Sequence, residues 1–158
     1  MPTFYRDLGV PDTPEGRFEM VGLHVALVVR RLRPTGAQGS ALGQELFELT
    51  FADMDESLRH IGIGELSVGK HITRLAGNFY ARLAALNEAL AGSQGAPLAP
   101  MLRTNVYHGG AAPSPHQVDA LVGYVETAAA GLQAQPIEHL LAGRIDWPPP
   151  ARRAEQNL

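Results

Sequence analysis

Apolar residues recur at every third or fourth position along most of this chain, which is the spacing of an amphipathic α-helix. The first long helix is predicted to run from about residue 14 to residue 32. Thr13 and Pro14 supply an N-cap and a proline suited to the first helical position, and Pro34 ends the pattern. Two opposite sides of this helix are apolar, which is typical of a helix in the centre of a bundle. The two stripes are Phe18, Val21, Val25, Val28 and Leu32, and Met20, Leu23 and Leu27.

Two further long helices are predicted to follow, each after a short connection. The second should extend from about Ser40 to Gly62, and the third from a cap at Ser67 to about Leu90. Short links between long helices favour antiparallel packing of neighbours. The second helix carries one stripe of Phe47, Phe51, Met54, Leu58 and Ile61 and another of Leu42, Leu46 and Leu49; the third buries Val68, Ile72, Leu75, Phe79, Leu86 and Leu90.

The last third of the chain predicts shorter elements. Residues 92–100 are rich in Gly, Pro, Ser and Ala, which indicates a loop, and a short helix is expected over 100–107. Ser114 can cap a further helix that places Val118, Leu121, Val122, Val125 and Leu132 inward. A last helical turn is expected over 137–141.

This periodicity predicts an all-α fold, a single-domain helical bundle of three long helices plus shorter C-terminal helices, over residues 1–147. Trp147 is the expected final anchor, and residues 148–158 are expected to form a proline-rich mobile tail. With 158 residues and 45% hydrophobic content, the chain is large enough to bury one sizeable core.

Composition excludes several classes of protein. The net charge of −3 gives no overall basic field for nucleic acid, and no run approaches the roughly 18 apolar residues that span a bilayer. Residues 1–8 lack the apolar run of a signal peptide. The absence of cysteine rules out disulfides and thiolate metal sites, and it favours a cytoplasmic location.

One segment, GELSVGK at residues 64–70, matches a phosphate-binding loop as far as its lysine. Such a loop needs a preceding strand and a hydroxyl next to the lysine for magnesium. Here a helix precedes the segment, His71 follows Lys70, and Glu65 would repel phosphate. The segment is therefore interpreted as a turn between helices.

Chemistry-bearing residues are scattered along the chain. No two histidines stand three or four residues apart with a carboxylate companion, as a helical metal site requires, and no serine is paired with a base at a recognisable spacing. We therefore expect no enzyme activity, no metal and no cofactor. The six histidines are His24, His60, His71, His108, His116 and His139.

Asp53 falls within the Leu42, Leu46, Leu49 stripe at about 100° per residue. An acid on an apolar face usually has a cation within reach. His24 and Arg31 share one side of the first long helix, so His24, Arg31 and Asp53 are predicted to form a buried or half-buried polar cluster. The alternative is that Asp53 lies at the rim of the core and contacts water.

The third long helix carries a cationic strip, with Lys70 and Arg74 at its centre and His71 and Arg82 along one flank. Such a strip could bind an acidic partner or RNA phosphate, and Tyr80 beside it could be an interface aromatic. The alternative is an ordinary solvated face. Lys70, Arg74, Tyr80 and Arg82 are the hypothetical partner-binding residues.

The segment from Phe51 to Lys70, FADMDESLRHIGIGELSVGK, resembles the ubiquinol–cytochrome c chaperone family. Its Asp-Met-Asp run followed by a Gly-x-Gly turn is the most specific part of the resemblance. Further matching segments occur in order between Phe4 and Tyr107: Phe4–Pro11, Gly16–Glu19, His24–Leu27, Arg31–Leu32, Phe79–Arg82 and Asn105–Tyr107.

Members of that family help to assemble the respiratory ubiquinol–cytochrome c reductase, and the mitochondrial ones bind newly made cytochrome b with a small partner protein near the ribosomal exit. The resemblance implies an assembly chaperone that binds cytochrome b on the cytoplasmic side of the inner membrane, with the ribosome and peripheral membrane association as further expected contacts. It implies no catalytic residues. Positions that match the family pattern without an assigned role are Asp53, Asp55, Arg59, Gly62, Gly64, Lys70, Tyr80 and Arg82.

The sequence departs from the family pattern in two places. Relatives usually have another helix before Phe4 and Tyr5, whereas Met1 and Pro2 come almost directly before them here. Either the helix is absent or the chain is truncated, and in both cases uncovered apolar surface would favour a homodimer or contact with a partner. Thr104 stands where a basic residue is expected.

Two other functions remain open. A haem-binding helical carrier would need His24 or His71 open to a pocket. A ribosome- or RNA-docking adaptor would use Lys70 and Arg74, and its binding would weaken with salt. The chaperone hypothesis predicts instead an apolar groove rimmed by charge, because these helices carry more apolar surface than a compact monomer can hide.

Overall fold

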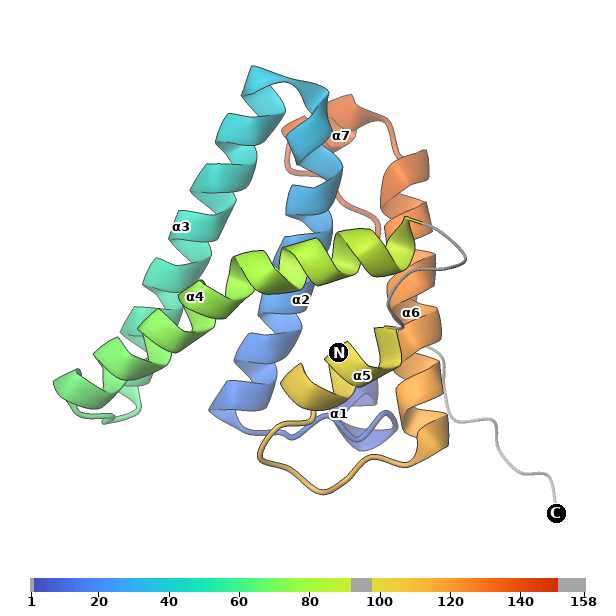
Figure 1. The fold of residues 1–158 in the computed structure, drawn as a ribbon. Coiled ribbons are helices and arrows are strands. Elements are labelled where there is room, and N and C mark those ends of the chain that lie inside the picture. Colours follow the sequence, from blue (N-terminus) through green and yellow to red (C-terminus); the bar gives the residue numbers. More distant parts are fainter. Residues whose placement is uncertain (1, 92–97, 151–158) are drawn as a thin grey trace, which may run out of the picture.

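The computed structural model describes residues 2–91 and 98–150, and every regular element in these two ranges is helical. Three long helices dominate: α2 (Pro14–Leu32), α3 (Ala37–His60) and α4 (Glu65–Leu90). Helix α3 lies beside α2 and runs back along it, whereas α4 turns back from the end of α3 and crosses α2 obliquely (Figure 1). The all-α bundle predicted from the periodicity is confirmed.

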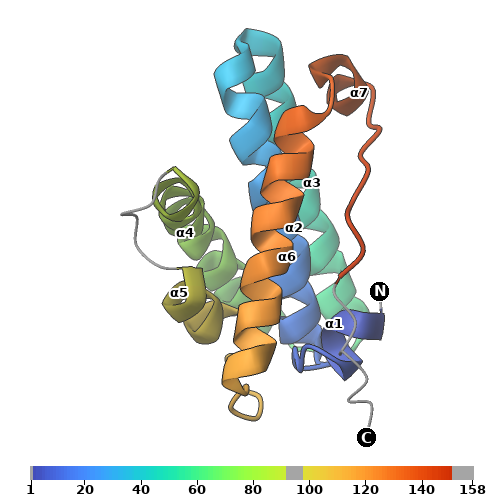
Figure 2. The same cartoon turned by 90° about the vertical axis from the view of Figure 1, so that its right-hand side faces the viewer.

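Shorter elements surround this core: α1 (Pro2–Arg6), a 3-10 turn η1 (Arg33–Thr35), α5 (Leu98–Asn105), α6 (Pro115–Ala134) and α7 (Ile137–Leu141). Helix α6 packs against α2, and α5 contacts both α4 and α6. The segment after α7 runs back along the bundle toward α1 (Figure 2). No helix within the described ranges is both long enough and apolar enough to cross a membrane.

Helix α2 is the central element, as its two apolar sides predict. It contacts α3, α4 and α6, and Ala26, Leu27, Val28 and Val29 are all buried in succession. Its N-terminus is fixed by the Thr13 hydroxyl, which accepts a hydrogen bond from a backbone N–H in the first turn. A continuous buried run of this kind arises because neighbouring helices cover more than one side.

The boundaries of α3 and α4 differ from the predicted ones because glycines, rather than side-chain caps, fix them. Helix α3 begins at Ala37 instead of Ser40, directly after Gly36, whose φ of 95° reverses the chain. Gly39 packs against the last turn of α2, where a Cβ would collide with the Leu32 carbonyl. Helix α4 begins at Glu65, so Ser67 lies in its first turn and is not the cap.

The predicted cap at Ser114 is confirmed. Its hydroxyl accepts from the Gln117 N–H, and the Gln117 side chain accepts from the Ser114 N–H. We expect Ser114→Ala to lower the free energy of unfolding by about 1 kcal/mol, because the Gln117 N–H in the first turn of α6 loses its acceptor. Urea unfolding followed by circular dichroism measures this change. Thr127→Ala on the exposed side of α6 is the control, and an equal loss in both variants would contradict the capping role.

The C-terminal segment is packed further than predicted. The Trp147 ring lies against His24 with centroids 4.7 Å apart, and the Gln135 side chain bonds to both backbone polar groups of Asp146. Pro150 is also buried, so the packed chain extends past the boundary predicted at residue 147. The rest of the predicted tail, 151–158, and residues 92–97 of the predicted loop lie outside the described residues.

Candidate functional site

Four aromatic rings gather where α3 faces α4. The Phe47 ring is central, with centroid distances of 4.6 Å to Phe51, 4.9 Å to Phe79 and 5.2 Å to Tyr80. Phe51 and Phe79 are buried, whereas Tyr80 is 43% exposed. The cluster therefore holds the two helices together on one side and presents an aromatic surface to solvent on the other.

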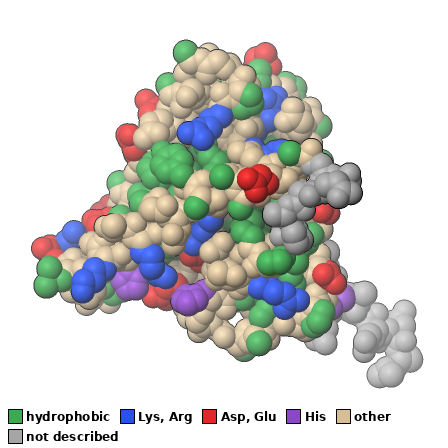
Figure 3. All heavy atoms as spheres, viewed as in Figure 1, with side chains coloured by type: hydrophobic (Ala, Val, Ile, Leu, Met, Phe, Trp, Pro, Cys, Tyr) green, Lys and Arg blue, Asp and Glu red, His purple; other side chains and the backbone are tan. Residues whose placement is uncertain are grey.

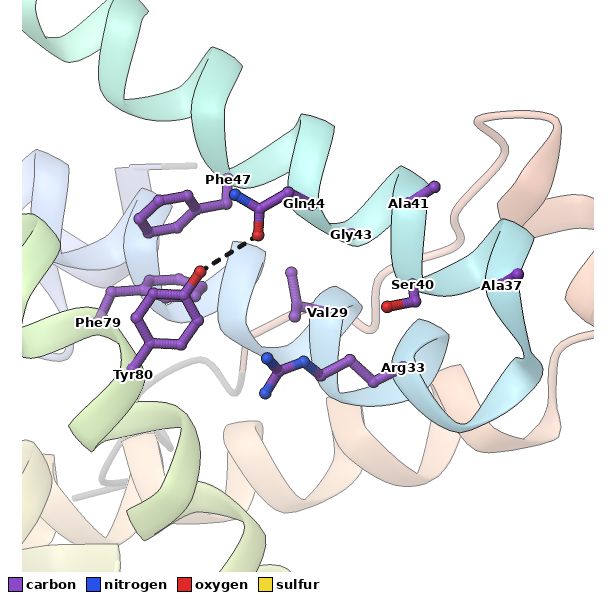
Figure 4. Close-up of a pocket in the computed structure, with 10 residues that line it drawn as sticks. All are labelled: Val29, Arg33, Ala37, Ser40, Ala41, Gly43, Gln44, Phe47, Phe79 and Tyr80. Atoms are coloured by element: carbon purple, nitrogen blue, oxygen red, sulfur yellow. Dashed lines mark hydrogen bonds between the residues drawn. The ribbon is translucent and has the colours of Figure 1, made fainter.

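This surface lines an open groove of about 460 Å³ between α2, α3 and α4 (Figure 4). Val29 and Phe79 form an apolar floor, and the first two turns of α3 contribute small residues to the wall. Gly43 is buried there, and a Cβ added to it would only touch Val29 at 3.7 Å. The remaining lining residues are Arg33, Ala37, Ser40, Ala41, Gln44, Phe47 and Tyr80. An apolar floor between small side chains suits a bulky aliphatic or aromatic group.

Polar groups fix the rim of the groove. The Tyr80 hydroxyl donates to Gln44 Oε1 at 3.3 Å, and the Arg33 guanidinium lies 5.7 Å from the Tyr80 ring centroid. Cation–π attraction and the hydrogen bond thus restrain the exposed ring from two sides. The lining is partly apolar and partly polar, with Arg33 as its charged residue, whereas the sequence predicted an apolar groove rimmed by charge. The groove carries no reactive pair of side chains, and it is suited to binding.

The cationic strip predicted on α4 is only partly formed. Lys70 and Arg74 are exposed and, with Ser67 and the half-exposed His71, line a shallow hollow near the α3–α4 turn. The segment that resembles a phosphate-binding loop was interpreted as a turn between helices, but only Gly64 precedes α4, and residues 65–70 form the first turns of that helix.

Arg82 does not belong to that strip, which corrects the sequence-based assignment. Its guanidinium forms a two-pronged ion pair with Glu19 on α2, with Nη2 donating to Oε1 at 2.9 Å and Nη1 donating to Oε2. Glu19 is buried, and burial raises the pKa of its carboxyl, while the hydrogen bonds from Arg82 oppose that rise. The pair ties α4 to α2, and Arg82 is therefore a structural cation.

The predicted polar cluster of His24, Arg31 and Asp53 is wrong, because the three side chains are directed to different places. Arg31 Nε donates to the Leu132 carbonyl at 3.1 Å at the end of α6. Asp53 is exposed on the outer side of α3. Among the described residues nothing covers the stripe at this level, since the neighbouring Leu49 is 69% exposed. The alternative, an acid in contact with water, is the correct one.

His24 has both ring nitrogens engaged. The Met20 carbonyl at 2.7 Å can only accept, so Nδ1 carries the hydrogen, and Nε2 accepts from the Tyr124 hydroxyl at 2.7 Å. Burial lowers the pKa of His24 and raises the pKa of Tyr124 to about 12, which favours the neutral forms that this arrangement needs. His24 therefore acts as a core residue with no free lone pair for a haem iron. Of the two haem candidates, His71 is the one that is partly open to solvent, where it lines the shallow hollow on α4.

Comparison with known proteins agrees with this architecture. A family model described as ubiquinol–cytochrome c chaperone matches residues 6–147, so the chain belongs to this family. The crystal structure of the Cbp3 homolog from Brucella abortus superposes with a TM-score of 0.79 at 36% identity, over 94% of this chain and 81% of that chain.

Two curated relatives share the same name, ubiquinol-cytochrome c reductase complex assembly factor 1. The mouse protein is 24% identical over 156 residues and the human protein is 22% identical over the same length. In both cases the match covers 98% of this chain and 52% of the relative. The chain therefore spans about half the length of the curated relatives that it matches.

Proposed function

We propose that this protein is an assembly chaperone for the ubiquinol–cytochrome c reductase, and that it holds a segment of cytochrome b in the groove between α2, α3 and α4. Family membership over residues 6–147 and the names of the relatives support the assembly role. The groove with its exposed aromatic ring is the observation that carries the binding role.

A membrane-protein client offers apolar helices, and a helix binds a groove through side chains on one face. The small residues of α3 let such a helix approach closely, and Phe47 and Tyr80 supply the large aromatic contacts that dominate binding energies. Arg33 at the rim would meet an acidic side chain or the carbonyl end of the bound helix. No step of this function requires a reaction, so the protein acts without catalysis.

Several partner assignments accompany this proposal. Lys70 and Arg74 remain candidates for an acidic partner or the ribosome, and Tyr80 for the client. A homodimer is a further expected contact, and the expected place of action is the cytoplasmic side of the inner membrane.

The proposal is tested by deleting the gene and restoring variants. Deletion should lower the level of assembled reductase, and the original chain should restore it. Ser40→Trp would fill the groove from an exposed position on α3, so we expect it to fold, to lose crosslinking to cytochrome b and to fail to restore the reductase. Glu45→Trp, exposed on α3 outside the groove, is the matched control.

Normal reductase in the deletion strain would contradict the assembly role. Equal behaviour of the two tryptophan variants would contradict the groove as the binding site and leave the assembly role standing. The two parts of the proposal therefore fail separately.

A further inference from the structure

The end of the α3–α4 hairpin exposes two large apolar side chains. Ile61 is 57% exposed just before the turn, and Leu66 is 87% exposed in the first turn of α4. Figure 1 places this turn at the end of the hairpin that lies furthest from α6. Neither side chain contributes much to the core, so folding alone does not explain a leucine and an isoleucine at this position.

Leu66 begins an exposed stripe on α4 that continues with cations. Leu66, Lys70 and Arg74 are four residues apart, so they share a face, and this face is opposite the buried Val68 and Leu75. Neither Lys70 nor Arg74 is in a salt bridge within the described part of the chain. Figure 3 shows hydrophobic, acidic and basic side chains at the left end of the molecule, with Lys, Arg and His side chains continuing along its lower edge.

Acidic groups near the turn lie to the side of this stripe. Glu65 and Asp55 both pair with Arg59, which holds their charge toward α3. Asp53 and Glu56 are exposed on α3 itself. The α4 stripe is therefore locally cationic although the chain as a whole carries a net charge of −3. A surface that combines a protruding apolar end with adjacent cations is complementary to an anionic lipid surface.

We propose that the end of the α3–α4 hairpin docks on an anionic phospholipid bilayer, with Leu66 and Ile61 entering the headgroup region and Lys70 and Arg74 contacting lipid phosphates. Long Lys and Arg side chains can keep their charges at the phosphates while their stems follow the apolar groups inward. Two apolar side chains and two cations give weak, reversible binding that salt reduces. This docking needs no client and does not depend on the proposed function.

Flotation with vesicles tests the proposal. We expect the protein to float with phosphatidylcholine vesicles that contain phosphatidylglycerol and to stay behind with phosphatidylcholine alone. Replacing Lys70 and Arg74 together with Ala should weaken binding about 25-fold, about fivefold or 1 kcal/mol for each cation. Leu66→Ser should weaken binding several-fold. Leu49 is also exposed but lies on α3 away from the turn, so Leu49→Ser should leave binding unchanged.

A fluorescent probe reports insertion directly. The chain contains no cysteine, so Leu66→Cys and Leu49→Cys each give one site for an environment-sensitive dye. Anionic vesicles should shift the emission of the dye at position 66 to the blue and leave the dye at position 49 unchanged. No vesicle binding, binding that survives loss of Leu66 and both cations, or salt-sensitive binding to RNA without vesicle binding would each overturn the proposal.

Discussion

Arg82→Met is expected to lower the free energy of unfolding by about 3 kcal/mol at about pH 8, because it leaves the buried carboxylate of Glu19 without its counter-charge. Arg82 itself is slightly exposed, which keeps the expected loss at the lower end of the range for buried pairs. Urea unfolding measures the change. Arg59→Met, which breaks only exposed pairs with Asp55 and Glu65, should leave the midpoint almost unchanged.

The stability of the Arg82→Met variant should depend on pH, because removal of Arg82 changes the pKa of the Glu19 carboxyl. Burial already raises the pKa of Glu19 above 4.5, and removal of Arg82 takes away the interactions that lower it. The folded variant then holds a proton that the unfolded chain releases as pH rises above 4.5. Its stability should therefore fall with rising pH, and the deficit against the original protein should be smaller at about pH 5 than at about pH 8.

A double variant separates the charge from the packing. Glu19→Leu combined with Arg82→Met removes both polar groups, so most of the loss should be recovered. A deficit that is independent of pH, or a double variant no better than Arg82→Met alone, would mean that Glu19 is ionised in contact with water and that packing alone is at stake.

The sequence predicted helix boundaries well where a capping side chain or a proline marks the end of the helix. The bounds of α2 follow from Thr13, Pro14 and Pro34, and the start of α6 from Ser114. The starts of α3 and α4 were missed by a few residues because their N-cap residues are Gly36 and Gly64, which have no side chain to cap the helix. Period alone also does not distinguish an oblique crossing of α4 from a parallel one.

The burial of each apolar stripe depends on which neighbours a helix has, and this is why part of the site was mispredicted. Helix α2 has two apolar sides and is covered by α3, α4 and α6, whereas the second apolar stripe of α3 is covered by described residues only near the start of the helix. Its second stripe is accordingly half-buried at Leu42 and Leu46 and exposed at Leu49, and Asp53 follows it into solvent. The apolar pattern of a helix at the edge of a bundle therefore does not predict which of its stripes is buried.

The ion pair between α2 and α4 could not be predicted from the sequence either. Glu19 and Arg82 are 63 residues apart, and on their own helices they look like ordinary surface charges. A groove was also expected, but as an apolar one rimmed by charge, whereas this groove mixes apolar residues with Ser40, Gln44 and Arg33. Its residues were not identified, apart from Tyr80, because Arg33 and Gly43 gain their roles only when η1 and α3 meet α4.

Phe79 and Tyr80 are neighbours on α4 with opposite expected roles. Phe79 is 3% exposed at the centre of the aromatic cluster, so Phe79→Ala should lower the free energy of unfolding by about 3–5 kcal/mol. Tyr80 is 43% exposed, so Tyr80→Ala should cost only about 1 kcal/mol from lost ring contacts. Urea unfolding of both variants measures the difference.

Tyr80→Ala, the variant with the smaller effect on stability, should have a large effect on client binding. Loss of the exposed ring removes the large contact at the rim of the groove, and Tyr80→Ala should weaken binding of cytochrome b about tenfold while the fold persists. Tyr80→Phe keeps the ring and loses only the bond to Gln44, so it should bind nearly as well as the original chain. If Tyr80→Ala captures cytochrome b at the original yield in crosslinking, the ring closes the aromatic cluster and the client must bind elsewhere on the molecule.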